Sequence, residues 1–274
     1  MEKRFLLIAL LLFFVPFSSA KIIFESPLNE LYNLGDNIEV NLSIEKAVAS
    51  EDYLNVFLDC DKDVLIIYKK YHKIEPNKKY FLVFEFPVSL EGECKIRASF
   101  DNEIVESQKF EVSHEINVDF EVNSMFFLPN EKIIVNGTAI KENGEGVDGV
   151  AVIYSEGLFN RTINVEDGKF FSEFLIKKDA YPKNYKLKIK VIEKNGGETG
   201  NYGEALREIE IGSLASNIIV ECNESIVPPK NLKIKAKLLD QAGNLIKNES
   251  IILKLFSPYM DNIVFDMVLK SDEE

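Results

Sequence analysis

Hydrophobic and polar residues alternate along almost the whole chain after residue 20. In Tyr185–Val191, apolar residues and lysines strictly alternate. A strand with this pattern has one buried and one solvated face. The pattern, rich in Ile, Val, Phe and Tyr, predicts strands at 38–44, 53–59, 64–71, 79–86, 94–100, 104–112, 116–122, 132–140, 150–155, 160–165, 169–176, 185–193, 205–211, 217–221, 231–239, 250–256 and 262–269.

Turn residues separate these segments, as at Asn143-Gly144, Asp167-Gly168, Asn195-Gly196-Gly197 and Gly243-Asn244. Short strands with turns at this spacing favour antiparallel β-sandwiches. We therefore expect an all-β protein, preceded only by a short helix in the first twenty residues.

The chain also repeats itself. The segment that begins near Pro129 matches, without a gap, the segment 99 residues later, so that Gly144 aligns with Gly243 and Val147 with Ile246. An earlier segment matches at an offset of 95 residues, where Gly35 aligns with Asn130 and Asp36 with Glu131. We predict three domains, at 21–114, 115–212 and 213–274, and we expect the third to be incomplete.

The units resemble the immunoglobulin-like repeats of prokaryotic secreted and surface proteins, including macroglobulin-type domains. The resemblance is carried by the glycine- and valine-rich run Gly144–Val152, followed by Asp167–Phe170 and Tyr185–Leu187. It implies tandem immunoglobulin-like sandwiches and is nearly silent on function, because such folds host many roles.

In that topology, the strands that carry Cys60 and Cys94 are neighbours in one sheet, and the resemblance therefore implies a Cys60–Cys94 disulfide. The alternative is two buried free thiols. For Cys222 we leave open burial, pairing with a cysteine outside this chain, and a cross-link between two chains.

The first twenty residues have the layout of a secretory signal peptide. Glu2, Lys3 and Arg4 precede an apolar stretch from Phe5 to Phe17, and small residues follow. The stretch is too short to span a bilayer easily. We expect cleavage after Ala20, and we expect no membrane-embedded segment in the remainder; the alternative is an uncleaved anchor.

The formal net charge is −13, with only two histidines and no tryptophan. Such an acidic chain repels polyphosphate, so nucleic-acid binding is disfavoured. Five Asn-x-Ser/Thr triplets are candidate N-glycosylation sites, at Asn41, Asn136, Asn160, Asn223 and Asn248.

Candidate chemistry is sparse. Asp59, Asp61 and Asp63 alternate at a strand end and form a candidate calcium site, although the EF-hand positions that should hold Gly and Glu hold Val64 and Lys70. The alternative is a solvated turn.

Three further features are interpreted conservatively. The Gly144–Gly149 run matches a dinucleotide-binding pattern, but a strand follows it, so we interpret it as a β-hairpin. We interpret His72 and His114 as solvated surface residues. In the glycine-rich loop 195–203, Asn201 and Tyr202 are candidate partner contacts.

Together these features predict a non-catalytic, exported protein, extracellular or at the cell surface, that acts as a stalk, adhesion or assembly module. We expect a protein or surface-polymer partner, no nucleic acid and no cofactor other than the candidate calcium. The alternative is the N-terminal accessory region of a larger secreted enzyme or of a macroglobulin-like protease trap.

Overall fold

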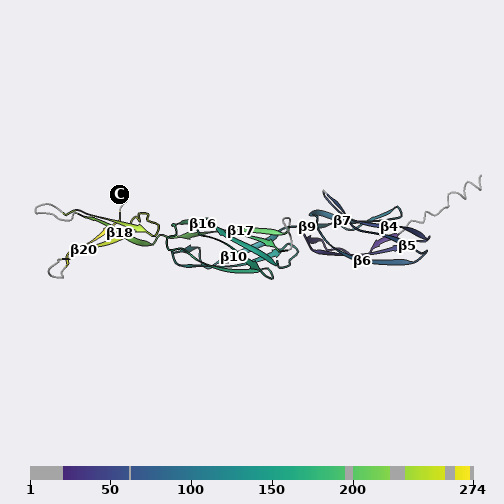
Figure 1. Ribbon diagram of the computed structural model, residues 1–274, viewed down its shortest axis with the longest axis horizontal. Helices are drawn as coiled ribbons and strands as arrows, with labels where there is room; N and C mark the ends of the chain where they lie inside the picture. Colours follow the sequence, from purple (N-terminus) through teal and green to yellow (C-terminus); the bar gives the residue numbers. More distant parts are fainter. Residues whose placement is uncertain (1–20, 62, 195–199, 223–231, 257–262, 272–274) are drawn as a thin grey trace, which may run out of the picture. The chain divides into compact units, whose positions relative to one another are not determined.

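The computed structural model describes residues 21–61, 63–194, 200–222, 232–256 and 263–271. Every regular element among them is a β-strand (Figure 1). The predicted signal segment and Asn223 lie outside the described residues. No described helix is long and apolar enough to cross a membrane. The chain divides into two compact units: residues up to Ile116 with 140–145 and 192–202, and the rest.

The first unit contains two packed sheets, and Figure 1 labels several of their strands, among them β4, β6 and β7. The smaller has the order β1-β3-β6 and is antiparallel. The larger has the order β2-β9-β7-β4-β5, with β8 also paired to β7, and only its β2–β9 pair is parallel. The strands are β1 (Lys21–Phe24), β2 (Leu31–Asn33), β3 (Asn37–Glu45), β4 (Ser50–Cys60), β5 (Val64–Ile74), β6 (Lys79–Pro87), β7 (Gly92–Phe100), β8 (Glu103–Glu106) and β9 (Phe110–Ser113).

Alternation along the strands builds the core of this unit. On β3, Ile38, Val40, Leu42 and Ile44 are all buried, and they form one cluster with the inward residues of β4 and β7. Because every second side chain of a strand points to the same face, two such sheets can share a single dry interior. The first unit is therefore a β-sandwich.

The second unit has the same strand order. Its smaller sheet runs β10-β12-β15, and its larger sheet runs β11-β17-β16-β13-β14. The β11–β17 pair is parallel, like β2–β9. The strands are β10 (Ile116–Val122), β11 (Phe126–Phe127), β12 (Lys132–Lys141), β13 (Gly149–Ser155), β14 (Phe159–Val165), β15 (Lys169–Leu175), β16 (Lys183–Glu193) and β17 (Tyr202–Ile211).

The chain after residue 212 forms two further antiparallel pairs, β18-β19 and β20-β21. These strands are β18 (Ala215–Cys222), β19 (Ile234–Asp240), β20 (Ser250–Phe256) and β21 (Ile263–Lys270). The two pairs correspond in chain order to β10-β12 and β13-β14. The division into three immunoglobulin-like domains remains a prediction, since compactness separates only two units.

The 99-residue repeat is confirmed at its central turn. Gly144 and Gly243 both have a positive φ, of 92° and 83°. Three backbone hydrogen bonds recur at the same offset. In the first copy they are Gly144 N to Lys141 O, Lys141 N to Glu145 O and Val147 N to Ala139 O. In the second copy they are Gly243 N to Asp240 O, Asp240 N to Asn244 O and Ile246 N to Leu238 O.

The same turn corrects one interpretation. The glycine run at 144–149 starts like a hairpin, but β12 pairs with β15 and β13 pairs with β14. The run therefore carries the chain from one sheet to the other.

The 95-residue offset is confirmed as well. Gly35 and Asn130 both have a positive φ, of 85° and 67°. The carboxylates of Asp36 and Glu131 each accept a hydrogen bond from the backbone N–H three residues earlier, at 2.7 Å in both cases. The acidic residue after the turn thus accepts the same backbone hydrogen bond in both repeats.

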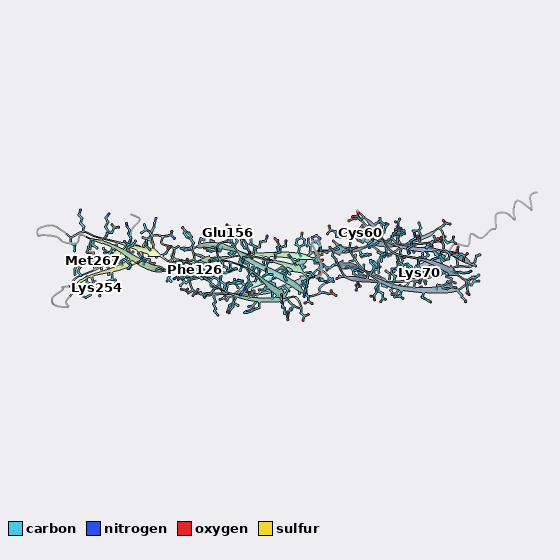
Figure 2. The ribbon with its side chains drawn as sticks, viewed as in Figure 1. Cys60, Lys70, Phe126, Glu156, Lys254 and Met267 are labelled. Atoms are coloured by element: carbon cyan, nitrogen blue, oxygen red, sulfur yellow. A yellow bond between two sulfur atoms is a disulfide. The ribbon has the colours of Figure 1, made fainter. Side chains whose placement is uncertain are left out.

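The predicted Cys60–Cys94 disulfide is confirmed. The two cysteines are direct partners on β4 and β7, with 4.1 Å between their Cα atoms, and both are buried. Cys60 is marked among the side chains in Figure 2. Cys222 is a free, exposed thiol, so burial was wrong for that residue.

Some strand boundaries differ from prediction. The segment 104–112 is two strands, β8 and β9, because Ser107 interrupts the ladder: its Oγ accepts a hydrogen bond from Ile96 N. Strand β5 continues to Ile74 and therefore includes His72. The short strands β1, β2 and β11 lie outside every predicted range.

Candidate functional site

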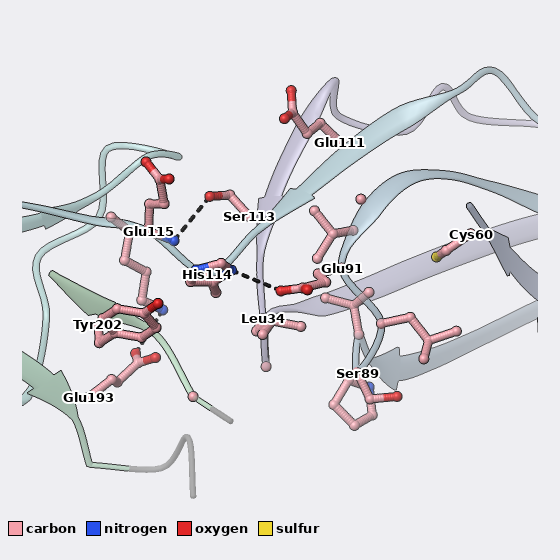
Figure 3. A pocket seen from close by; sticks show the side chains of 18 of the residues that line it. Leu34, Cys60, Ser89, Glu91, Glu111, Ser113, His114, Glu115, Glu193 and Tyr202 are labelled. Carbon is pink, nitrogen blue, oxygen red and sulfur yellow. Dashed lines mark hydrogen bonds and ion pairs between the residues drawn. The ribbon is translucent and has the colours of Figure 1, made fainter. Parts of the chain in front are cut away.

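A cleft of about 1050 Å³, lined by both polar and apolar groups, lies within the first unit. Figure 3 shows its lining, in which His114, Glu91 and Tyr202 lie near one another. The lining comes from the end of β9, from the connection between β6 and β7, and from the turn after β4, with Lys141 and Glu193 on a further side. Loops at a strand end thus supply most of its polar groups.

His114 is held rather than free. Its Nδ1 lies 2.8 Å from Oε2 of Glu91, and its ring stacks on the ring of Tyr202 with centroids 5.1 Å apart (Figure 3). The interpretation of His114 as a merely solvated residue is therefore wrong. The carboxylate of Glu91 and the ring of Tyr202 therefore fix the position of the imidazole.

His72 is also partnered. It lies on β5, where its Nε2 is 3.1 Å from the Tyr68 hydroxyl. Burial, and secondarily the charge of Lys70, lowers the pKa of His72 below its usual value. The imidazole is thus biased toward its neutral form, and it too is more than a solvated surface residue.

Lys141 is the centre of a charged network beside the cleft. Its Nζ lies 2.9 Å from Glu193 Oε1 and 3.3 Å from Asp36 Oδ1, and the side chains are 11%, 15% and 14% exposed respectively. Asn143 donates from Nδ2 to the other oxygen of Asp36, at 2.8 Å. Burial alone would lower the pKa of Lys141, but the hydrogen bond to Glu193 and the charge of Asp36 outweigh it, so the pKa is raised. The amine therefore stays protonated and is a structural cation, not a nucleophile.

Asn201 is fully buried, which corrects its assignment as a surface contact. Its Nδ2 donates to Leu34 O at 2.8 Å and to Glu193 Oε2 at 2.5 Å. Tyr202, the next residue, is 45% exposed at the rim of the cleft. Of the two predicted contact residues, only Tyr202 presents its side chain outward.

The structure does not bring Asp59, Asp61 and Asp63 together as a metal cluster. Asp59 lies on β4, with Oδ2 3.9 Å from Nε of Arg97. Asp61 accepts a hydrogen bond from Glu93 N. No group of three or more acidic, His or Cys side chains suited to a metal occurs within the described part of the chain.

Four of the candidate glycosylation residues lie in the described part. Asn41, Asn136 and Asn160 lie on strands β3, β12 and β14, and Asn248 lies in the connection between β19 and β20. No pattern along the sequence indicates the Lys141 network. Lys141 is 105 residues from Asp36, and no local pattern links the two.

No protein-family model matches the chain, and no curated protein matches it. Among solved structures, β-glucosidase from Listeria innocua aligns with 35% of this chain and 16% of its own, at 14% identity and a TM-score of 0.30. E. coli alpha-2-macroglobulin in its native conformation aligns with 94% of this chain and 20% of its own, at 12% identity and a TM-score of 0.30. The chain thus spans a fifth or less of either protein, and likenesses this weak carry no argument about function.

Proposed function

We propose that this chain is an exported, non-catalytic module of immunoglobulin-like repeats that spaces or presents a binding surface outside the cell. The observation that carries the proposal is the buried Cys60–Cys94 bridge inside a sandwich whose strand order recurs in the next unit. Disulfides form and persist in oxidising compartments, and a repeated sandwich is suited to spacing and contact.

The polar groups of the cleft favour binding over bond-making. Lys141 is held as a cation by Asp36 and Glu193, and His114 is engaged by Glu91 and Tyr202. Groups that neutralise one another in this way stabilise a loop arrangement and leave little reactivity to a substrate. The exposed ring of Tyr202 supports a contact with a protein or surface-polymer partner, because tyrosine combines apolar area with a polar tip.

The experiment is peptide mass spectrometry of the protein from the surface and culture fractions of its source. Alkylation before reduction preserves the bridge. We expect a mature N-terminus at Lys21, a cross-linked peptide pair containing Cys60 and Cys94, and surface labelling of intact cells. Intact Met1 with both thiols alkylated would contradict export.

The full-length gene product then separates the stalk from the alternative. A catalytic domain, or a thioester-type Cys-Gly-Glu-Gln segment, in the same product would favour the accessory role in an enzyme or protease trap. Further repeats or a membrane anchor would favour the stalk.

A further inference from the structure

Three of the four described candidate glycosylation residues share one geometric feature. Each lies on a strand directly opposite an exposed apolar side chain: Asn41 faces Val83, Asn136 faces Phe171, and Asn160 faces Tyr154. The exposed fractions of these partners are 66%, 59% and 44%. Direct antiparallel partners point to the same side of a sheet with their Cβ atoms about 5 Å apart, so each asparagine stands beside an uncovered apolar surface.

The surroundings of Asn136 are the most developed. A groove of about 620 Å³ contains Asn136 and Phe171 together, with Asp119 and Glu121 of β10 on its other side. Strand β12 is central in the sheet β10-β12-β15, so Asn136 has the phenyl ring on one flank and the carboxylates on the other. Asn136 and Thr138 are exposed, while Gly137 between them turns inward against Phe170.

The groove matches the chemistry of a saccharide. A pyranose has an apolar C–H face, which packs on an aromatic ring, and a rim of hydroxyls, which donate hydrogen bonds to carboxylates. Phe171 lies on the edge strand β15 with 59% of its side chain exposed, and a sugar packed on the ring would cover this apolar surface. We propose that Asn136 carries an N-linked glycan whose first sugar packs on Phe171, with its hydroxyls toward Asp119 and Glu121.

The attachment requires a polyprenyl-diphosphate-linked saccharide as donor. A C–N bond forms between Asn136 Nδ2 and the anomeric carbon of the sugar, while the anomeric C–O bond breaks. The polyprenyl diphosphate leaves with the electron pair, and the amide nitrogen gives up one proton. The inference rests on export, which is the first part of the proposed function, but not on any particular partner.

Asn160 with Tyr154, and Asn41 with Val83, extend the same arrangement. Beside Asn41, Phe81 is 66% exposed and lies opposite Ser43, the third residue of the triplet. Asn248 is the internal control for this arrangement, because it lies on no strand and so has no cross-strand partner beside it. Its backbone N–H donates a hydrogen bond to Ser271 O.

The experiment uses the full chain with its own leader, secreted from an N-glycosylating host. Four proteins form the cycle, namely the wild type, Asn136→Gln, Phe171→Ala and the double variant, and Phe171→Tyr is a fifth protein for comparison. Glycopeptide mass spectrometry should show occupancy at Asn136. Asn136→Gln should then lower the melting temperature by about 2–4 °C in the presence of Phe171 and by less than about 1 °C in its absence. Phe171→Tyr, which keeps a ring, should retain the wild-type value.

The same four proteins from a host without N-glycosylation isolate the sugar. There the coupling between positions 136 and 171 should vanish. Persistent coupling in the unglycosylated set, or an unoccupied Asn136 in secreted protein cleaved before Lys21, would overturn the inference while leaving the proposed function intact. Uncleaved protein that is never secreted would instead contradict the proposed function. Self-association of the unglycosylated chain that Phe171→Ala abolishes would assign the face to a second copy and would also overturn the inference.

Discussion

Gly137, the middle residue of the Asn136 glycosylation triplet, packs so closely on Phe170 that it leaves no room for a side chain. A Cβ added at this position would lie 2.0 Å from Cζ of Phe170, whose ring is buried. Gly137→Ala should therefore destabilise the second unit by about 1–3 kcal/mol, as overpacking does in closed cores. Urea denaturation followed by hydrogen exchange of the β12 and β15 peptides measures this loss.

The control removes the obstacle. In Phe170→Leu the ring is absent, so adding Gly137→Ala to that variant should cost clearly less than it does in the wild type. Equal costs in the two backgrounds would show that the contact with Phe170 does not explain the glycine.

Asp240 supplies a pH dependence at the residue scale. Burial would raise its pKa, but hydrogen bonds from the Asn244 side chain and from the backbone N–H groups of Asn244 and Ala242 outweigh it, so the pKa is lowered. A carboxyl with a lowered folded pKa stabilises the fold above its unfolded value near 4 and loses that contribution as the pH falls through the folded value.

We therefore expect thermal stability to decline, as the pH falls below about 4, more steeply in the wild type than in Asp240→Asn. Hydrogen exchange of the peptides that span 238–246 reports the turn itself. Parallel declines of the two proteins over this range would show that Asp240 is not the titrating group.

At the scale of elements, the sequence predicts long alternating strands well and short ones poorly. Buried aliphatic side chains alternate with more exposed residues along most of β3 and β12. The predicted bounds of both strands agree with the structure to within a residue or two. β2 and β11 have only three and two residues. Each pairs in parallel with the strand that comes last along the chain in its sandwich, β9 or β17. So few residues carry no period, and their pairing depends on the finished fold.

The Cys60–Cys94 bridge gives a prediction at the element scale. It joins β4 and β7 across 34 residues of sequence. Replacing both cysteines with alanine should lower the free energy of unfolding of the first unit by about 3–4 kcal/mol, because the unfolded chain regains the entropy of an open loop. Equilibrium urea unfolding, with hydrogen exchange to assign the transition to first-unit peptides, measures the loss.

The matched control is Cys222→Ala, because this cysteine is exposed and unpaired. Its removal should leave stability within about 0.5 kcal/mol of the wild type. A double variant as stable as the control would mean that the bridge contributes nothing to the fold.

At the scale of the whole molecule, contacts between distant segments escape prediction from sequence. The pattern of turns predicted the repeat, because each turn is specified by residues within one short window. Asn201 and Leu34 are 167 residues apart, and Asn201 was expected at the surface because its neighbours are polar and glycine-rich. Only the folded first unit, which gathers three separate segments of the chain, buries its amide.

The Lys141 network tests how those segments are held together. Lys141→Met leaves the carboxylates of Asp36 and Glu193 without their cation while keeping the length of the side chain. Losing one partner of a largely buried ion pair costs about 3 kcal/mol, so hydrogen exchange should accelerate in the segments 33–36, 140–145 and 192–194 together. Lys73→Met, which removes an exposed partner of Glu51, should change little.

The difference in stability between the wild type and Lys141→Met depends on pH in a direction that follows from the pKa of Lys141. The folded pKa of Lys141 is raised, so its contribution is complete below the usual lysine value near 10.4 and is lost as the pH rises through the folded value. The stability gap between wild type and Lys141→Met should therefore be constant from about pH 7 to about pH 10 and should close above that range.

Adding Glu193→Gln to Lys141→Met should recover part of the loss at neutral pH, because one unpaired carboxylate becomes a neutral amide that still accepts the hydrogen bond from Asn201. A gap that neither closes at high pH nor shrinks in the double variant would mean that Lys141 stabilises the unit by packing of its aliphatic stem rather than by charge.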